Sequence, residues 1–466
     1  MTRLDTDPQT QPQRLADLTE SERNRRFARL QELMPAVWDS IRLELEDESV
    51  VVVPSVTLDP ARPGAGSLTQ AFEERFLFLL LLLRQPRLRM IYVTSMPIRP
   101  SIIEYYLALL PAVIPSHAMA RLNLLSVGDS SAVPLSAKLL ARPRMLSKIA
   151  SMIPNRQHCH LIPYGTTGLE RDIALTLGIP MYGPDPRLAD LGSKTGGRRL
   201  FAEEGVQHPL GVGDLHSFED VTNAIMKMFE QRPSIDEVIV KLNEGVSGAG
   251  NALVDLRGIT DTGNSARRSQ VAQRVCSMQL ESASTTVAAY ESKFEQNGGI
   301  VEERIVGEEL LSPSVQLRVL PDRSVELLST HDQLLGGASG QTYLGCIFPA
   351  DPAYSRLISE PAITIGERLA KEGAIGRFAL DFVVVRDTAG EWSAYAIELN
   401  LRRGGTTHPF LTLQFLTDGS YDGASGRFLL PSGDQRHLVA TDHLESSELR
   451  ALAVEDLFDI VARYGL

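Results

Sequence analysis

The chain has 466 residues, of which 43% are hydrophobic and 22% charged, and its formal net charge is -12 at pH 7. This length exceeds what one ordinary hydrophobic core supports, so we expect two or three domains. The acidic balance argues against nonspecific nucleic-acid binding, which depends on basic patches, but it is compatible with a local basic pocket for ATP.

Three widely spaced cysteines, Cys159, Cys276 and Cys346, form no CxxC pair, which is typical of a reduced cytoplasmic compartment. The N-terminal sequence MTRLDTDPQTQPQRL contains no apolar run and predicts no secretory signal. The longest apolar run, Phe76–Leu83, is far shorter than the ~20 residues of a membrane span and predicts a buried helix. We therefore expect a cytoplasmic protein without membrane or nucleic-acid partners, and we leave homo-oligomerisation open.

The first part of the chain predicts one α/β domain behind a disordered start. Residues 1–18 are polar, so we expect disorder there, and Thr19 with Glu22 predicts a capping box for a helix to about Glu46. Strand-like and helical runs then alternate, which predicts βαβ units and a parallel sheet over residues 19–186. The expected strands are Ser49–Ser55, Leu88–Ser95, Arg121–Val127 and Cys159–Tyr164, and the expected helices are Leu68–Leu83, Ile102–Leu110, Leu135–Met152 and Gly168–Leu177.

Two lysines mark the part that follows. Lys194 lies in a loop ahead of a helix, where a lone lysine is usually solvated. Lys241 ends the strand EVIVK, and the glycine-rich loop NEGVSGAGN comes next. Glycines let backbone N–H groups reach phosphate oxygens, and a nearby lysine adds a positive charge. The alternative is an ordinary hairpin turn, which needs only two to five residues. The expected phosphate contacts in this loop are Glu244, Gly245, Ser247, Gly248 and Gly250.

The acid-rich segment Gly298–Leu311 predicts a strand and a turn. One interpretation is a solvated edge strand. The other is a purine site, with Glu302, Glu303 and Ile305 as wall and hinge and with Glu308 or Glu309 accepting the ribose hydroxyls. Before this segment, we expect a polar loop and then a helix over Asp261–Asn297.

The region after this segment predicts two strands and a loop. Arg318 lies on the first strand, Val315–Asp322, and the second strand is Ser324–Asp332. The glycine-rich loop Leu334–Gly345 suits a mobile lid. At its base, His331 and Asp332 are either catalytic or, as we favour, a turn-stabilising pair. A helix over Pro361–Glu372 follows.

The stretch from Asp381 to Asn400 predicts a β-hairpin, because two runs rich in β-branched and aromatic residues flank the turn segment RDTAGE. Centring the turn on Ala389-Gly390 pairs Asp387 with Trp392, Val385 with Ala394 and Asp381 with Glu398.

This register brings Asp381, Glu398 and Asn400 to one face of the hairpin. Two carboxylates that lie close together repel each other, and a hard cation such as Mg²⁺, which prefers oxygen ligands, relieves that repulsion. A register slip of one residue would send Asp381 to the opposite face and leave a surface hairpin with scattered acids. Arg402 and the Arg403-Gly404-Gly405 run that follow predict a cationic loop where backbone approaches a ligand.

Taken in chain order, these motifs resemble the ATP-grasp superfamily of carboxylate–amine ligases over about Arg187–Phe415. The α/β domain ahead of them resembles the usual pre-ATP-grasp domain. The segments TDGSYDGASGRFLLPSGDQRHLVATDHL and SSELRALAVEDLFDIVARYGL are similar to the C-terminal module of the pheganomycin-type peptide ligases. The resemblance implies an ATP-grasp domain over residues 187–418 and a C-terminal module over residues 419–466.

The resemblance also implies the chemistry. Lys194 and Lys241 would hold ATP phosphates, and Asp381, Glu398 and Asn400 would hold Mg²⁺, or alternatively Mn²⁺. A substrate carboxylate would form an acylphosphate, and an amine of an amino acid or short peptide would convert it to an amide, ADP and phosphate. Pheganomycin-type ligases join a modified amino acid to the N-terminus of a peptide, which implies a role in secondary-metabolite biosynthesis.

The arginine roles depart from the family pattern. Several family members place an arginine two residues before the metal-binding aspartate, where this chain has Ala379, and the nearest arginine is Arg377. Arg402 or Arg318 would therefore stabilise the acylphosphate. Two rival hypotheses keep the fold: a kinase that phosphorylates a hydroxyl, and a catalytically inactive nucleotide-binding protein. The complete set of expected metal ligands argues against the second.

Overall fold

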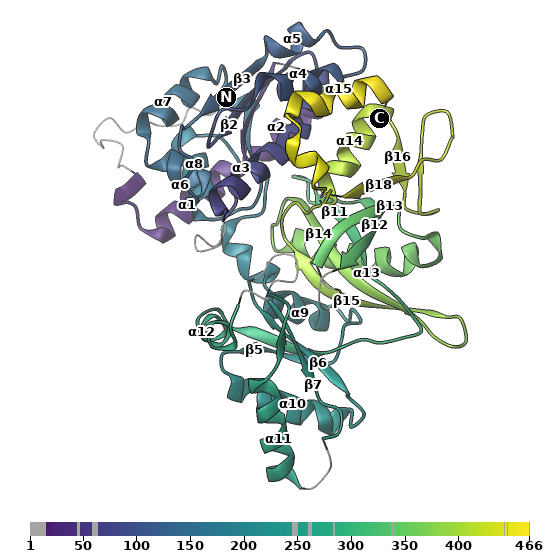
Figure 1. Ribbon diagram of the computed structural model, residues 1–466. Coiled ribbons are helices and arrows are strands. Elements are labelled where there is room, and N and C mark those ends of the chain that lie inside the picture. Colours follow the sequence, from purple (N-terminus) through teal and green to yellow (C-terminus); the bar gives the residue numbers. More distant parts are fainter. Residues whose placement is uncertain are drawn as a thin grey trace. The chain divides into compact units, whose positions relative to one another are not determined.

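The computed structural model describes residues 15–43, 47–57, 64–244, 250–259, 263–282, 285–336, 340, 342–441, 443–444 and 446–465. The chain divides into two compact units, Met1–Pro186 and Arg187–Leu466, which we call unit 1 and unit 2 (Figure 1). The expected further boundary at residue 418 stays a prediction.

Unit 1 is built on a four-stranded parallel sheet, as the alternating pattern predicted, with strand order β3-β2-β1-β4. All six residues of β1 are buried, because helices cover both faces of such a sheet and its strands read as continuous apolar runs. The strands are β1 (Glu48–Val53), β2 (Leu88–Thr94), β3 (Leu122–Ser126) and β4 (Cys159–Pro163).

Two long helices expected in unit 1 are each divided. The helix from Thr19 is α1 (Glu20–Gln31) and α2 (Met34–Leu43), and its predicted capping box is confirmed. The helix expected over Leu135–Met152 breaks before Pro143, because proline is tolerated in a first turn but not in a helix interior. The pieces and remaining helices are α3 (Ala65–Arg75), α4 (Pro100–Ala108), α5 (Pro115–Met119), α6 (Leu135–Leu140), α7 (Pro143–Met152) and α8 (Gly168–Leu177).

One further expectation for unit 1 is confirmed and one is wrong. The apolar run forms a buried helix, as expected, and this helix is the 3₁₀ helix η2 (Phe76–Arg84) that follows α3. The end of the segment expected to be disordered forms η1 (Leu15–Asp17), and Leu18 is buried directly after it. Residues 1–14 lie outside the described part of the chain.

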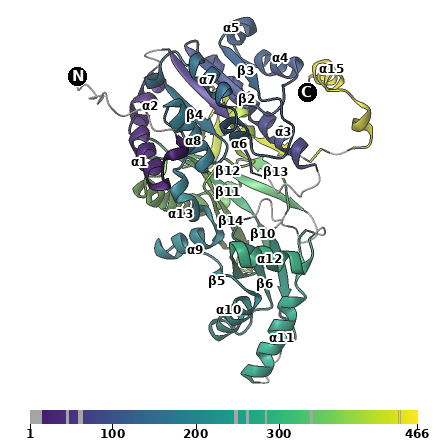
Figure 2. The ribbon, with the colours of Figure 1, turned by 90° about the vertical axis from the view of Figure 1, so that its left-hand side faces the viewer.

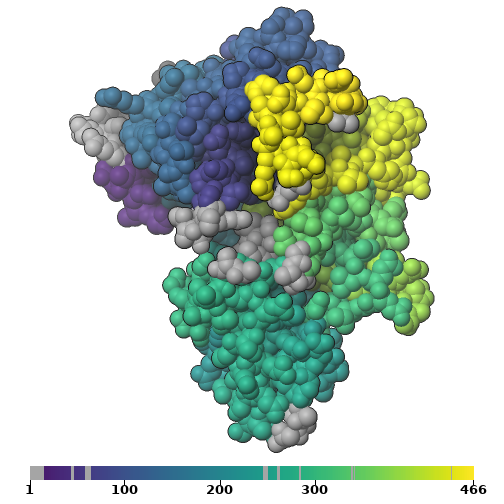
Figure 3. All heavy atoms as spheres, viewed as in Figure 1, coloured from purple at the N-terminus to yellow at the C-terminus, as the bar shows by residue number. Residues whose placement is uncertain are grey.

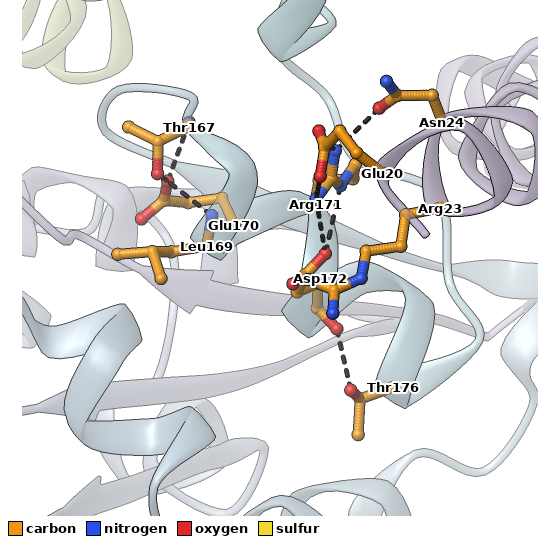
Figure 4. A network of polar contacts seen from close by, with 9 residues as sticks. All are labelled: Glu20, Arg23, Asn24, Thr167, Leu169, Glu170, Arg171, Asp172 and Thr176. Carbon is orange, nitrogen blue, oxygen red and sulfur yellow. Dashed lines mark hydrogen bonds and ion pairs between the residues drawn. The ribbon is translucent and has the colours of Figure 1, made fainter. Parts of the chain in front are cut away.

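A polar network joins α1 to α8 within unit 1 (Figure 4). The buried Arg171 guanidinium donates hydrogen bonds to Asn24 Oδ1 at 2.6 Å and to Glu20, both on α1. Arg23 on α1 forms an ion pair with Asp172 on α8, with 2.8 Å between the nitrogen and the oxygen. A buried arginine needs such partners, and here they hold the first helix against the last one of the unit.

Unit 2 begins with a connecting helix and an antiparallel sheet. The five strands have the order β5-β9-β6-β7-β8, and α10 and α11 pack on them around a core that includes Val238 and Val240 (Figure 2). The segment expected to be one loop and one helix holds two helices. The elements are η4 (Pro186–Gly192), α9 (Lys194–Glu203), β5 (Gly211–Leu215), α10 (Phe218–Gln231), β6 (Glu237–Leu242), β7 (Asn251–Asp255), α11 (Asn264–Cys276), β8 (Gln279–Leu280), α12 (Val287–Asn297) and β9 (Gly299–Glu303).

The second sheet of unit 2 has seven strands. β10 and β11 lie end to end along one edge of β14 in a common register, and β15 lies along its other edge. The long helix α13 covers one face of this sheet, and its apolar residues form the core with Phe378, Leu380 and Phe382. The elements are β10 (Glu309–Leu311), β11 (Pro313–Val319), β12 (Val325–Gly336), β13 (Thr342–Phe348), α13 (Pro352–Lys371), β14 (Gly376–Arg386), β15 (Trp392–Asn400), α14 (Thr407–Thr417) and β18 (Leu438–Thr441).

The ends of the expected lid belong to β12 and β13, and residues 337–339 and 341 lie outside the described residues. The C-terminal part of unit 2 contains the hairpin β16 (Ser420–Asp422) and β17 (Arg427–Leu429), then η5 (Glu448–Ala451) and α15 (Val454–Tyr464). No described residue of α15 is buried, and Figure 3 shows this yellow segment at the surface. Among the described residues, no helix is long and apolar enough to cross a membrane.

Candidate active site

Asp381 and Glu398 lie directly opposite each other on β14 and β15, as predicted. The two other expected pairs are wrong by one residue, because Arg386 and not Asp387 faces Trp392. Asp387 instead forms the turn, where its carboxylate accepts hydrogen bonds from the backbone N–H groups of residues 389 and 391 at 2.9 Å. A β-bulge at Ile397 adds one residue to β15 and restores the predicted pairing at the acids.

Asp381, Glu398 and Asn400 form a group that we call the carboxylate row, and Lys194 lies beside it. Asn400 Nδ2 donates to Asp381 Oδ2 at 2.9 Å, and Lys194 Nζ lies 2.5 Å from Glu398 Oε1. Burial and the neighbouring Glu398 carboxylate raise the pKa of Asp381. Burial alone would raise the pKa of Glu398 too, but the Lys194 ammonium, with Arg402 and Lys241 at longer range, lowers it overall. The site thus places two close acids among three cations.

These groups fit a magnesium ion shared with a ligand. The raised pKa of Asp381 reflects burial first and the close Glu398 carboxylate second, and a hard cation would relieve the repulsion between the two carboxylates. The described residues contain no cluster of three or more His, Cys, Asp or Glu side chains arranged for a metal. Two carboxylates and the Asn400 amide oxygen are nevertheless what Mg²⁺ uses when substrate phosphates supply its other ligands.

Lys194 is the first residue of α9, where a loop was expected. Ser193 caps this helix by accepting from the Gly196 N–H at 2.9 Å. A Cβ atom at Gly196 would lie 1.9 Å from a backbone oxygen of η4, and one at Gly197 would lie 3.4 Å from Leu399 Cβ. Gly196 therefore lets α9 approach η4, and Gly197 lets it approach β15, where Lys194 reaches the acids.

Lys241 lies one residue before the end of β6, where it was expected to be the last, and its ammonium forms a buried ion pair with Glu302 on β9. The side chains of the two residues are 5% and 4% exposed, so each charge depends on the other. Arg198, one helical turn after Lys194 on α9, lies 3.7 Å from the same Glu302 carboxylate. Burial lowers the pKa of Arg198. Helix α9 thus contacts both the five-stranded and the seven-stranded sheet of unit 2.

Asn243 links the two lysines and was missed by the sequence analysis. Its Oδ1 accepts hydrogen bonds from Thr195 N at 3.0 Å and from Thr195 Oγ1 at 2.7 Å. Its Nδ2 donates to the Asn297 carbonyl at 3.0 Å. The side chain therefore ties the residue after Lys194 to the segment that directly follows Lys241. No local motif reveals this contact, because its partners are far apart in sequence.

The expected phosphate loop is described only at its two ends. Glu244 and Gly250 are described, whereas Gly245, Ser247 and Gly248 lie outside the described residues. Tyr290 Oη donates to the carbonyls of Val240 and Gly250 at 3.2 and 3.0 Å, which fixes the base of the loop. The glycine-loop assignment itself stays a prediction.

The acid-rich segment is not an edge strand, because β9 lies between β5 and β6. Glu303 is buried, and its carboxylate accepts from Leu210 N at 2.9 Å and pairs with Arg232. Ile305 is half-buried in the connection that follows β9. Glu309 is half-exposed on β10, with its carboxylate 3.6 Å from Arg386. The structure does not bring Glu309 to the carboxylate row.

Of the two candidate arginines, the structure brings Arg402 to the acids. The Arg402 backbone N–H donates to the Asn400 carbonyl at 2.8 Å, and the positive charge of the Arg402 side chain favours the ionised form of both carboxyls. Arg318 pairs with Glu326 and lies opposite Arg377 on β14. It is four residues along β11 from the residue that faces Asp381, which corresponds to about 13 Å.

His331 and Asp332 lie within β12, so a turn-stabilising pair is wrong. His331 is fully buried against Phe348, and burial lowers its pKa to about 3. Asp332 accepts a hydrogen bond from Tyr354 Oη at 2.7 Å. These contacts serve packing, and neither side chain touches the carboxylate row.

A parallel α/β unit followed by two antiparallel sheets, with lysines and carboxylates converging between them, is the architecture of an ATP-grasp protein. The chain belongs to the IQCH-like ATP-grasp family, whose model matches residues 186–289 and 269–424, about half of the chain. It is similar to an L-propargylglycine–L-glutamate ligase of Streptantibioticus cattleyicolor, with 28% identity over 370 residues that cover 76% of this chain and 72% of that protein.

Two further similarities are more distant. IQ motif-containing protein H of Danio rerio is 24% identical over 395 residues, which cover 76% of this chain but 37% of that protein. This chain therefore spans little more than a third of the length of that relative. A biotin carboxylase from Campylobacter jejuni, solved as a β,γ-ATP complex, has a TM-score of 0.51 and 15% identity, covering 85% of this chain and 76% of that one. This last likeness concerns the fold alone.

Proposed function

We propose that this protein is an ATP-dependent carboxylate–amine ligase that joins an amino-acid carboxylate to the amine of an amino acid or short peptide. The observation that carries the proposal is the carboxylate row, in which Asp381, Glu398 and Asn400 face Lys194 on one side of unit 2. Family membership and the amino-acid ligase among the relatives support the same chemistry. A cytoplasmic location and the oligomeric state stay predictions.

In this proposal Lys194 and Lys241 bind the phosphates of ATP. Lys194 would exchange part of its contact with Glu398 for phosphate oxygens, and Lys241 stays anchored by Glu302. Asp381, Glu398 and Asn400 would hold Mg²⁺, which would neutralise phosphate charge during transfer. Mn²⁺ is the alternative ion for the same oxygen ligands.

The nucleotide base would lie along the end of β9. Because the carboxylates of Glu302 and Glu303 already hold Lys241 and Arg232, we propose that this segment offers its backbone groups to the base. Ile305, half-buried after the strand, supplies an apolar contact, and Glu309 remains the proposed ribose acceptor.

The reaction has two steps. An oxygen of the substrate carboxylate attacks the γ-phosphorus, the bond to the leaving ADP oxygen breaks, and an acylphosphate forms. The amine then attacks the acyl carbon, the bond to the phosphate oxygen breaks, and the amine loses its proton as phosphate leaves. We propose that Arg402 stabilises the negative charge that develops in both steps. Holding the reactants in position supplies most of the rest of the acceleration.

Nucleotide product analysis tests this proposal. The full-length protein is incubated with Mg-ATP and a pool of amino acids and short peptides, and the products are separated by mass. We expect ADP, phosphate and a new amide only when a carboxylate and an amine are both present. Formation of AMP would overturn the acylphosphate route, and ADP with a phosphorylated substrate but no amide would favour the kinase hypothesis.

A further inference from the structure

The loop between β15 and α14 is held by one buried glutamine, Gln316 on β11. The Gln316 side chain is 2% exposed, and its amide nitrogen donates to the Thr406 hydroxyl. Its amide oxygen accepts from Thr407 Oγ1 at 3.0 Å. The Thr407 hydroxyl in turn accepts from the Gly404 N–H at 3.1 Å. The two ends of one side-chain amide therefore bind two successive threonines.

This contact lies beside the carboxylate row. Gln316 faces Ala379 on β14, and Ala379 faces Asn400 on β15, so the three residues form one line across the sheet. Two residues further along β11, Ser314 faces Asp381. Ala379, in the middle of this line, has only a methyl group as its side chain. Gly404 lies so close to Gln316 that a Cβ atom added at Gly404 would be 3.6 Å from Gln316 Nε2. The glutamine thus reaches the loop directly.

The loop that Gln316 binds also carries Arg402. The Arg402 backbone is fixed at one end by the Asn400 carbonyl. At the other end, the loop is fixed by Thr406 and Thr407, both 4% exposed or less. Polar groups this deeply buried cost free energy when they lose their partners, so the loop has one favoured path while the glutamine is present.

We propose that Gln316 is a positioning residue that holds the loop over residues 402–407 so that Arg402 faces the carboxylate row. This inference rests on the proposed function, because its consequence for catalysis is the placement of the charge of Arg402 on the acylphosphate. Gln316 acts through the loop and touches no reacting atom. A displacement of about 1 Å in such a group can reduce a rate by about 100-fold.

The kinetics of the Gln316→Leu variant test the proposal. Leucine keeps about the volume of the glutamine side chain and removes both of its hydrogen bonds. We expect kcat for amide formation to fall by about 10- to 100-fold while the ATP dissociation constant changes less than about threefold. The double variant Gln316→Leu/Arg402→Ala should be no slower than Arg402→Ala alone, since both changes remove the same effect. Additive losses would overturn the proposal, because Gln316 would then act by another route.

A matched pair at Thr407 covers the case in which Gln316→Leu fails to fold. Thr407→Ser keeps the hydroxyl and should retain near-normal kcat, whereas Thr407→Val should reproduce the loss. Hydrogen exchange of the ligand-free protein supplies a readout that does not depend on activity. The amides of Gly404 and Thr407 should exchange at least about tenfold faster in Gln316→Leu, because an amide exchanges when its local structure opens. Unchanged exchange with normal kcat would contradict the inference, whereas a wild-type protein that makes no amide would contradict only the proposed function.

Discussion

Asp381 and Glu398 face each other across β14 and β15, and a bulge at Ile397 gives them this pairing. Lys194 contacts Glu398, and Asn400 contacts Asp381, so each acid has a different nearest partner. Burial and the Glu398 charge raise the pKa of Asp381, whereas the contact with Lys194 outweighs burial at Glu398 and lowers its pKa. A divalent cation between them would stabilise the ionised form of both.

Asp381→Asn and Glu398→Gln should each reduce the rate of ADP formation by at least about 100-fold, because each removes a proposed charged metal ligand and the several kcal/mol of transition-state stabilisation that goes with it. Glu391→Gln is the matched control, since this exposed residue of the same hairpin loses the same charge. Near-normal ADP formation in either site variant would contradict the metal assignment. Circular dichroism would confirm that the fold is retained.

Lys241→Met should lower the free energy of unfolding by about 3–5 kcal/mol, because it leaves Glu302 buried without its main partner. The double variant Lys241→Met/Glu302→Gln should recover most of this loss, since neither residue then carries a charge. The ATP affinity of both variants should be low, because both lack the Lys241 charge that we propose binds phosphate. Denaturant unfolding and nucleotide titration separate the two effects, with Lys227→Met on the exposed side of α10 as control.

Asn243→Ala should weaken ATP binding by about tenfold, the equivalent of one charge-assisted contact of about 1.4 kcal/mol. The variant removes the amide that joins Thr195 to the end of β6, so Lys194 and Lys241 lose their fixed spacing. Asn297→Ala is the matched control, because Asn297 takes part through its backbone carbonyl. Equal ATP affinity of the two variants would show that the spacing has no effect.

Because His331 is buried, we expect the folded protein to lose stability in acid. The folded-state pKa of His331, about 3, lies below the unfolded value of 6.5, so the unfolded chain binds a proton that the folded chain does not. The resulting loss begins as the pH falls through 6.5 and amounts to about 2 kcal/mol at pH 5. His331→Phe should remove this part of the pH dependence. The exposed His437→Gln serves as control, and an identical pH profile for wild type and His331→Phe would contradict the account.

The sequence allowed the class of fold and the acid pair to be predicted for clear physical reasons. Alternation of strand and helix patterns leads to a parallel sheet, and β-branched runs around a turn lead to a hairpin. The pairing of Asp381 with Glu398 was nevertheless reached through two errors that cancel. The turn closes one residue away from the expected position, and the bulge at Ile397 shifts the register back.

Other features could not be predicted because they depend on contacts between distant segments. Gln316 lies ninety residues from Thr406, and no motif marks either of them. The burial of Glu302 follows from the position of β9 between two strands, which the local acid-rich sequence conceals. By contrast, the break before Pro143 was missed although the sequence marks it, since proline is poorly tolerated inside a helix.

The measurement that tests the ligase account most directly is the fate of the substrate carboxylate oxygens. A carboxylate substrate labelled with ¹⁸O in both oxygens is converted with Mg-ATP and its amine partner, and the products are analysed by mass. The account predicts one ¹⁸O atom in the released phosphate, because the oxygen that attacks the γ-phosphorus leaves with it. Label in AMP, or phosphate without label, would contradict the acylphosphate mechanism.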